Sequence, residues 1–151
     1  MLRNSSLDKN YLKRTTNLLN NMNLSTNIKD QILNAEAKAL ATTGVDGLNV
    51  VPVSVVFVED DHILFCDFFM SKTVENIKEN TEISLCAWSG LQGVQVKGRA
   101  EYLTTGSLYE EMQKAMTEKF PERTLKGVLK IAPQVVYDVS AGSLGKKLSG
   151  D

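Results

Sequence analysis

Two hydroxyl residues flank a lysine in the segment SKTVENI, residues 71–77, which lies between an apolar run ending at Phe69 and another beginning at Ile83. We expect a short helix to begin in this segment. A helix start directs several backbone N–H groups and a partial positive charge outward. Together with a lysine and two hydroxyls, it would suit a phosphate monoester, which needs many donors and a cation. A capped surface helix with an exposed lysine has the same pattern, so the residues alone leave both interpretations open.

The other residues that could do chemistry form no recognisable catalytic set. His62, the single histidine, follows three acidic residues at an expected hairpin tip. This exposed setting disfavours a role in a Ser-His-Asp triad or a Cys-His dyad. Cys66 and Cys86 lack CxxC spacing, which argues against zinc. Two buried free thiols are expected, because a disulfide would require their strands to be neighbours. A chain without a recognisable nucleophile, metal cluster or acid–base pair must rely on a bound cofactor for catalysis or be non-catalytic.

Composition and charge exclude several classes of protein. The 151 residues include 17 Lys plus Arg and 18 Asp plus Glu, which argues against a nucleic-acid binder driven by bulk positive charge. No stretch is apolar enough for a membrane span and no signal-peptide core is recognisable, so we expect a cytoplasmic protein. Residues 1–22 are rich in Asn and are expected to form a flexible or weakly helical extension. One domain is expected over residues 23–151.

Hydrophobic periodicity predicts the elements that must position the SKTVENI segment. A helix is expected over 26–40, capped by Ser25 or Thr26, followed by a turn at the Asp-Gly pair 46–47. Ser71 or Thr73 is expected to cap the helix over 71–80. The other expected elements are strands over 49–58, 62–69, 82–88 and 94–103, a helix over 107–120 that begins with a capping box of Ser107 and Glu110, and one or two strands over 126–140.

This order of elements favours a β-rich α+β fold. The strands are joined by short turns and show no regular βα alternation, which argues against a parallel doubly wound sheet. An antiparallel sheet closed into a small barrel, with helices outside it, is the expected architecture.

From about residue 24 to residue 148 the chain resembles the FMN-binding split barrels related to pyridoxamine 5′-phosphate oxidase. The resemblance depends on the order and spacing of several segments. They are AKALATTGVDGLNVVPVSVVFV, ILFCDFFMSKTVENIKENTEISL, VQVKGRAEYL and VVYDVSAGSLGKKL. It implies a small antiparallel split β-barrel with flanking helices, FMN as the cofactor, and a homodimer that holds the cofactor at the subunit interface.

The resemblance also implies which residues bind the cofactor. They are Ser71, Lys72, Thr73 and Asn76 at the phosphate, Val51, Pro52, Val53 and Ser54 beside the isoalloxazine and ribityl chain, Cys66 and Asp67 on the neighbouring strand, and Trp88 and Gln92 reaching a flavin held by the other subunit.

Two departures from the family pattern narrow the expected function. The phosphate segment has Lys72-Thr73 where the family often has an arginine–lysine pair, and the chain ends in SLGKKLSGD, without the arginine and histidine of the vitamin B6 oxidases. Pyridoxamine 5′-phosphate oxidation is therefore not expected. We expect an FMN-dependent oxidoreductase of unidentified substrate. The alternatives are a haem-binding or F420-binding relative, or a non-catalytic cofactor-binding or stress-response module on the same fold.

Overall fold

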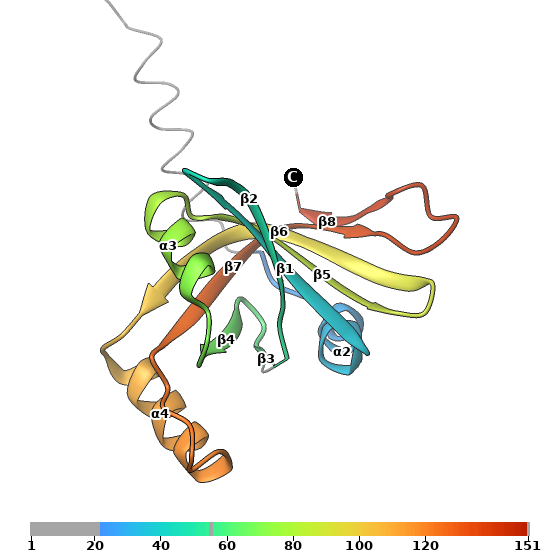
Figure 1. Ribbon diagram of the computed structural model, residues 1–151. Coiled ribbons are helices and arrows are strands. Elements are labelled where there is room, and N and C mark those ends of the chain that lie inside the picture. Colours follow the sequence, from blue (N-terminus) through green and yellow to red (C-terminus); the bar gives the residue numbers. More distant parts are fainter. Residues whose placement is uncertain (1–21, 55, 151) are drawn as a thin grey trace, which may run out of the picture.

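The computed structural model describes residues 22–54 and 56–150 (Figure 1). Within these residues three helices accompany eight strands. The helices are α2 (Thr26–Asn34), α3 (Ser71–Glu79) and α4 (Ser107–Lys119), and the strands are β1 (Ala37–Gly44), β2 (Gly47–Pro52), β3 (Val56–Val58), β4 (Ile63–Asp67), β5 (Glu82–Ser89), β6 (Gln92–Leu103), β7 (Gly127–Asp138) and β8 (Lys147–Gly150).

All strand pairings in the described sheet are antiparallel, as the sequence predicts. The strands follow the order β2-β1-β5-β6-β7-β4-β3, and β8 pairs with β7. The two edge strands, β2 and β3, are consecutive in the chain and are joined by residues 53–55 alone. Such a link spans at most ~14 Å, so the two edges of the sheet must lie close together. The sheet is therefore curled into a barrel that stays open between β2 and β3.

Strand β4 is the most deeply enclosed element, and each of its five residues is buried. Because side chains alternate across a strand, Ile63 and Phe65 face the main core inside the barrel. Leu64 and Cys66 face the other way, into a second apolar cluster that contains Met112 and Met116 of α4. Helix α4 thus covers the outer face of β4, and the uninterrupted apolar run of this strand follows from burial on both sides.

The first helix predicted from the sequence is too long. It begins as expected, with the Ile28 N–H donating to Ser25 Oγ at 3.3 Å, but it ends at Asn34. Residues 37–44 form β1, which pairs with both β2 and β5. The alanines of this segment suit a helical period, and tertiary pairing overrides that preference. The predicted turn is confirmed one residue earlier, at 45–46, between the paired Gly44 and Gly47, and Gly47 follows it with a positive φ of 92° that glycine adopts without strain.

Three further predictions of local structure are wrong. The strand expected over 49–58 is divided: β2 ends at Pro52 and β3 begins at Val56, although the Val53 N–H still donates to the Lys38 carbonyl at 3.1 Å. Gly106 precedes α4 and makes no side-chain cap, so the predicted capping box of Ser107 and Glu110 does not form. Met70 likewise precedes α3, which excludes the predicted capping by Ser71 or Thr73.

Cys66 and Cys86 are free thiols, as predicted, but only Cys66 is buried; Cys86 is half-buried, contrary to the prediction. Their strands, β4 and β5, are separated by β6 and β7, so the two sulfurs cannot be bonded across neighbouring strands. Residues 126–140 supply one strand, β7, that runs through Pro133, and β8 was not predicted. None of the helices within residues 22–54 and 56–150 is long and apolar enough to cross a membrane. The predicted extension lies outside the described residues, except for Met22.

The close pairing of β6 with β7 generates a prediction about stability. The register shifts at Gly98, where a Cβ would overlap the carbonyl oxygen of Ala132. Gly98→Ala should therefore lower the free energy of unfolding by about 1–3 kcal/mol. Urea unfolding followed by circular dichroism measures the change. Glu101→Ala, at an exposed position of the same strand, is the control and should change stability by less than about 0.5 kcal/mol. Equal effects of the two substitutions would contradict the proposed overlap.

Candidate functional site

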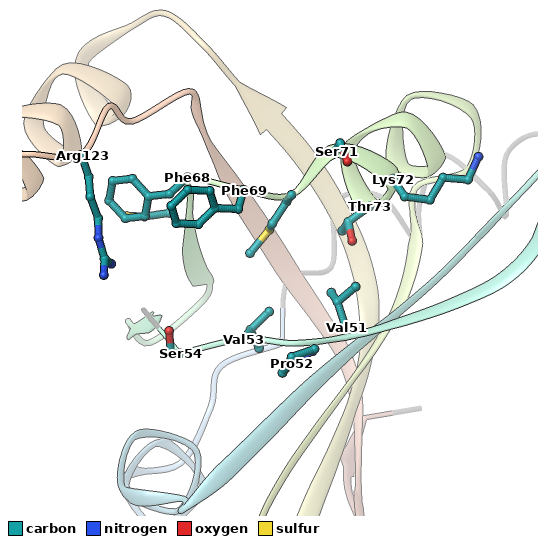
Figure 2. Close-up of a pocket in the computed structure, with 12 residues that line it drawn as sticks. Val51, Pro52, Val53, Ser54, Phe68, Phe69, Ser71, Lys72, Thr73 and Arg123 are labelled. Atoms are coloured by element: carbon teal, nitrogen blue, oxygen red, sulfur yellow. The ribbon is translucent and has the colours of Figure 1, made fainter.

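A cavity of about 400 Å³ opens at the start of α3 (Figure 2). It is formed by three segments that are far apart in the chain: the end of β2 with the residues after it, the segment from β4 into α3, and the loop before β7. The predicted site residues that line it are Val51, Pro52, Val53, Ser54, Cys66, Ser71, Lys72 and Thr73. The structure therefore brings most of the predicted residues together around one space.

The first turn of α3 borders this cavity with unsatisfied backbone donors. The helix begins at Ser71, and the preceding Met70 provides no side-chain hydrogen bond to its N–H groups. The Ser71 N–H donates to the Phe69 carbonyl at 3.2 Å, and no acidic residue lies in the first turn. The remaining N–H groups and the positive end of the helix dipole are available to an anion.

Lys72 is already paired with carboxylates. Its Nζ contacts Asp46 in the β1–β2 turn and lies 3.3 Å from Glu75 Oε2, one helical turn ahead. The hydrogen bond to Asp46, followed by the one to Glu75, raises the pKa of Lys72, and the same contact lowers the pKa of Asp46. Figure 2 shows the lysine side chain extending away from the cavity. An anion at the helix start must therefore compete with Asp46 and Glu75 for this cation.

Thr73 and Asn76 join α3 to the sheet through a buried polar network. Asn49 Nδ2 donates to Thr73 Oγ1 at 3.3 Å and to Thr42 Oγ1 at 3.4 Å, and Asn76 Nδ2 donates to Thr42 Oγ1 at 3.1 Å. Asn76 is packed so tightly against Gly44 that a Cβ there would overlap its side chain. Asn76 therefore positions the helix on β1 and does not line the cavity, so its predicted contact with a phosphate stays a prediction.

Asp67 holds the segment that leads into α3. Its buried carboxylate accepts a hydrogen bond from the Met70 N–H at 2.7 Å through Oδ1 and another from the Tyr102 hydroxyl at 2.7 Å through Oδ2. Burial, followed by the hydrogen bond to Asp67, raises the pKa of Tyr102. Gly127 has no side chain and leaves room for the tyrosine ring. Asp67 does not line the cavity; in this structure it fixes the turn at 67–70, and its predicted cofactor contact is untested.

The Cys66 thiol lines the cavity and is not poised as a nucleophile. Burial raises the pKa of Cys66 to about 11, so the neutral thiol predominates at neutral pH.

One end of the cavity, formed by Phe68, Phe69, Met70 and Arg123, was not predicted from the sequence. Phe68 meets Phe120 edge to face, with ring centroids 6.0 Å apart. The Arg123 guanidinium lies 4.6 Å from the Phe120 centroid and 5.7 Å from that of Phe68. Arg123 follows α4 in a loop without a motif, so only the tertiary contact between α4 and β4 brings it to the site. In the sequence, only the consecutive aromatic residues at 68–69 could have indicated this end of the cavity.

Two predicted site residues and the histidine lie elsewhere. Trp88 and Gln92 are exposed at the β5–β6 hairpin, which Figure 1 shows pointing away from α3. Their contact with a cofactor in a second subunit is untested. His62 borders a different hollow, beside α4, with its Nδ1 2.6 Å from Asp61 Oδ1. Across the described ranges, no group of three or more His, Cys, Asp or Glu side chains is arranged to hold a metal ion.

Comparisons with known proteins agree with this geometry. Residues 24–140 match the family model of pyridoxamine 5′-phosphate oxidase. The chain is 32% identical over 128 residues to Uncharacterized protein MJ0282 of Methanocaldococcus jannaschii, with 79% of this chain and 84% of that protein covered.

Solved structures share the fold. HupZ of Group A Streptococcus has a TM-score of 0.70 at 23% identity, covering 80% of this chain and 97% of HupZ. An FMN-binding protein from Syntrophomonas wolfei subsp. wolfei has a TM-score of 0.65 at 20% identity, covering 89% of this chain and 95% of that protein. These likenesses confirm the expected fold class, an antiparallel split barrel with flanking helices.

The contact between Asp67 and Tyr102 generates a prediction with a pH dependence. Tyr102→Phe leaves a buried carboxylate oxygen without its donor and should cost about 1–3 kcal/mol of folding free energy at pH 7. Because the folded state raises the pKa of Tyr102, the unfolded chain ionises first, near pH 10, and the wild type loses this stabilisation as the pH rises above that value. The difference between wild type and Tyr102→Phe should therefore shrink between pH 10 and 11.

Urea unfolding at pH 7, 10 and 11 measures this difference. Tyr137→Phe is the matched control, because no hydrogen bond of the Tyr137 hydroxyl occurs within the described residues. A Tyr102→Phe variant as stable as Tyr137→Phe at pH 7, or a difference that does not depend on pH, would contradict the assignment.

Proposed function

The chain belongs to the pyridoxamine 5′-phosphate oxidase family, and on this basis we propose that the cavity beside α3 binds FMN and that the protein is a small flavin-dependent oxidoreductase. One observation carries the proposal. A single cavity has an open helix start with two hydroxyl residues and a lysine at one side, and an apolar strand end along its wall. That combination is complementary to a molecule with a phosphate monoester at one end and a flat ring system at the other.

Different residues of the cavity would contact the two ends of the cofactor. Ser71, Lys72 and Thr73 would hold the phosphate through the helix start, a hydroxyl and the ammonium group. Val51, Pro52 and Val53 would lie along the ring and the ribityl chain, where their apolar side chains exclude water from one side. FMN, when bound, supplies electron and hydride transfer, and the chain supplies binding, orientation and exclusion of solvent.

We also propose that the functional unit is a homodimer with the cofactor at its interface. Leu48 and Val50 are 88% and 66% exposed on one face of β2, which is an edge strand of the sheet. Phe69, at the cavity, is 80% exposed. Large apolar side chains gathered at a sheet edge and a cavity mouth are typical of surfaces that another chain covers. In such a dimer the exposed hairpin with Trp88 and Gln92 would reach the cofactor held by the other subunit.

The position of His62 disfavours haem in this cavity. This histidine borders a separate hollow and contacts Asp61, so it is not available as an axial ligand at the site beside α3.

The first experiment identifies the ligand. We would record the visible spectrum of freshly purified protein, denature it and determine the mass of what it releases. A flavin spectrum with FMN released supports the proposal, whereas released F420 or haem, or a colourless protein that takes up no added FMN, would overturn it. Anaerobic reduction by NADH or NADPH then tests catalysis. A bound flavin that neither these nor other physiological donors reduce favours a non-catalytic module.

Charge substitutions at α3 test the phosphate contact. Lys72→Ala should weaken FMN binding about tenfold, because it removes a charge-assisted hydrogen bond to the phosphate. Asp46→Asn should strengthen binding about two- to fivefold, because it removes a carboxylate that competes for the same ammonium. Quenching of FMN fluorescence during titration with apoprotein measures both affinities.

The matched control is Lys78→Ala, which removes the same charge from the exposed last turn of the same helix. It should leave the affinity within about twofold of wild type, since screening weakens a distant exposed charge. Equal FMN affinities of Lys72→Ala and Lys78→Ala would contradict the assignment of Lys72 to the phosphate site.

A substitution on the edge strand tests the dimer. Leu48→Asp should convert a dimer into monomers and weaken FMN binding by about tenfold or more, because it places an unpaired charge in an apolar interface. Size-exclusion chromatography with light scattering measures the mass. Leu33→Asp, at a partly exposed position on α2, is the control and should remain dimeric. A monomeric wild type with full FMN affinity would refute the interfacial site.

A further inference from the structure

Arg123 is an exposed residue that lines the cavity and that the FMN proposal does not use. Its N–H donates to the Phe120 carbonyl at 3.0 Å, which closes a tight turn directly after α4. Its guanidinium lies over the rings of Phe120 and Phe68, at 4.6 and 5.7 Å from their centroids. Phe68 belongs to the segment between β4 and α3, so the arginine bridges the two walls that meet at this end of the cavity.

The charge of Arg123 is not neutralised within the part of the chain that the structure describes. No Asp or Glu in residues 22–54 and 56–150 lies within 4.0 Å of its guanidinium nitrogens. Lys72, the other cation at the cavity, contacts both Asp46 and Glu75. A guanidinium that is stacked on aromatic rings still presents N–H groups along its edge, in a geometry that matches a carboxylate or a phosphate.

The two cations lie at different ends of the cavity. Figure 2 shows Arg123 beside Phe68 and on the same side as Ser54, whereas Thr73 and Lys72 lie on the far side, next to Val51. FMN carries one phosphate monoester. With that group at the start of α3, its ring system would extend toward the end that Arg123 borders, and Arg123 would face whatever lies against the ring.

We propose that Arg123 binds the anionic group of the substrate, a carboxylate or a phosphate, and so makes the site selective for negatively charged substrates. The inference deepens the proposed function and rests on it, because it places the substrate beside a flavin held as described above. The aromatic rings orient the guanidinium and shield one side of it from water, which strengthens its interaction with an anion.

Matched neutral and anionic ligands test this selectivity. Nicotinate and nicotinamide share one flat ring and differ in charge, and phenyl phosphate compared with nicotinate separates a preference for phosphate from one for carboxylate. FMN-saturated protein is titrated with each ligand, and amide shifts in ¹H–¹⁵N NMR spectra measure the affinities, including weak ones. The variants are Arg123→Gln and, as the control, Lys126→Gln, which removes an exposed charge three residues away that does not line the cavity.

Wild type and Lys126→Gln should bind nicotinate about tenfold more tightly than nicotinamide, and Arg123→Gln should lose this preference while still binding nicotinamide. The preference should decrease as salt is added. Equal affinity of wild type for the two ligands would overturn the inference, as would equal weakening of both ligands in Arg123→Gln, which would indicate a structural role.

The same experiment separates this inference from the proposed function. FMN affinity is measured first in every variant. A wild type that fails to bind FMN contradicts the proposed function, and the titrations on that protein then show whether the anion preference exists without the flavin. A loss of FMN affinity in Arg123→Gln as large as that of Lys72→Ala would overturn the inference, because the arginine would then act on the cofactor.

Discussion

The buried carboxylate of Asp67 is the contact on which the candidate site depends. It lies at the end of β4, the most enclosed strand, and accepts hydrogen bonds from the Met70 N–H and the Tyr102 hydroxyl. These bonds determine how the chain leaves the sheet and where α3 begins. An unpaired carboxylate in this position would be costly, so the tyrosine on β6 and the small Gly127 beside it are part of the same arrangement. The site is thereby attached to the core of the barrel.

A second network holds the other side of α3. Thr73 and Asn76 are hydrogen-bonded through Asn49 and Thr42 to the first two strands, so the helix cannot move independently of the sheet. Polar side chains that are buried and satisfied give such a junction a defined geometry. The helix start is consequently presented to the cavity as a rigid group of donors, which lowers the entropic cost of binding an anion there.

The two cations at the cavity differ in their surroundings. Lys72 contacts two carboxylates before any ligand arrives, so part of its interaction with an anion is offset by the loss of those contacts. Arg123 has aromatic neighbours and no carboxylate partner within the described ranges. A ligand therefore meets an attenuated charge at the helix start and an unneutralised one at the aromatic end. This asymmetry suits one resident anion and a second, exchangeable one.

The sequence by itself determined the class of fold, most of the strands and the short helix in the segment 71–80, although not the residue that caps it, because apolar alternation, turn residues and the order of family segments can be read along the chain. It could not determine that residues 37–44 pair as a strand, since their alanines suit a helix equally well and only the partners β2 and β5 decide. Nor could it show that Asn76 is buried against Gly44 or that Arg123 reaches the cavity. Both depend on contacts between segments distant in the chain, which form only when the sheet curls and α4 packs on β4.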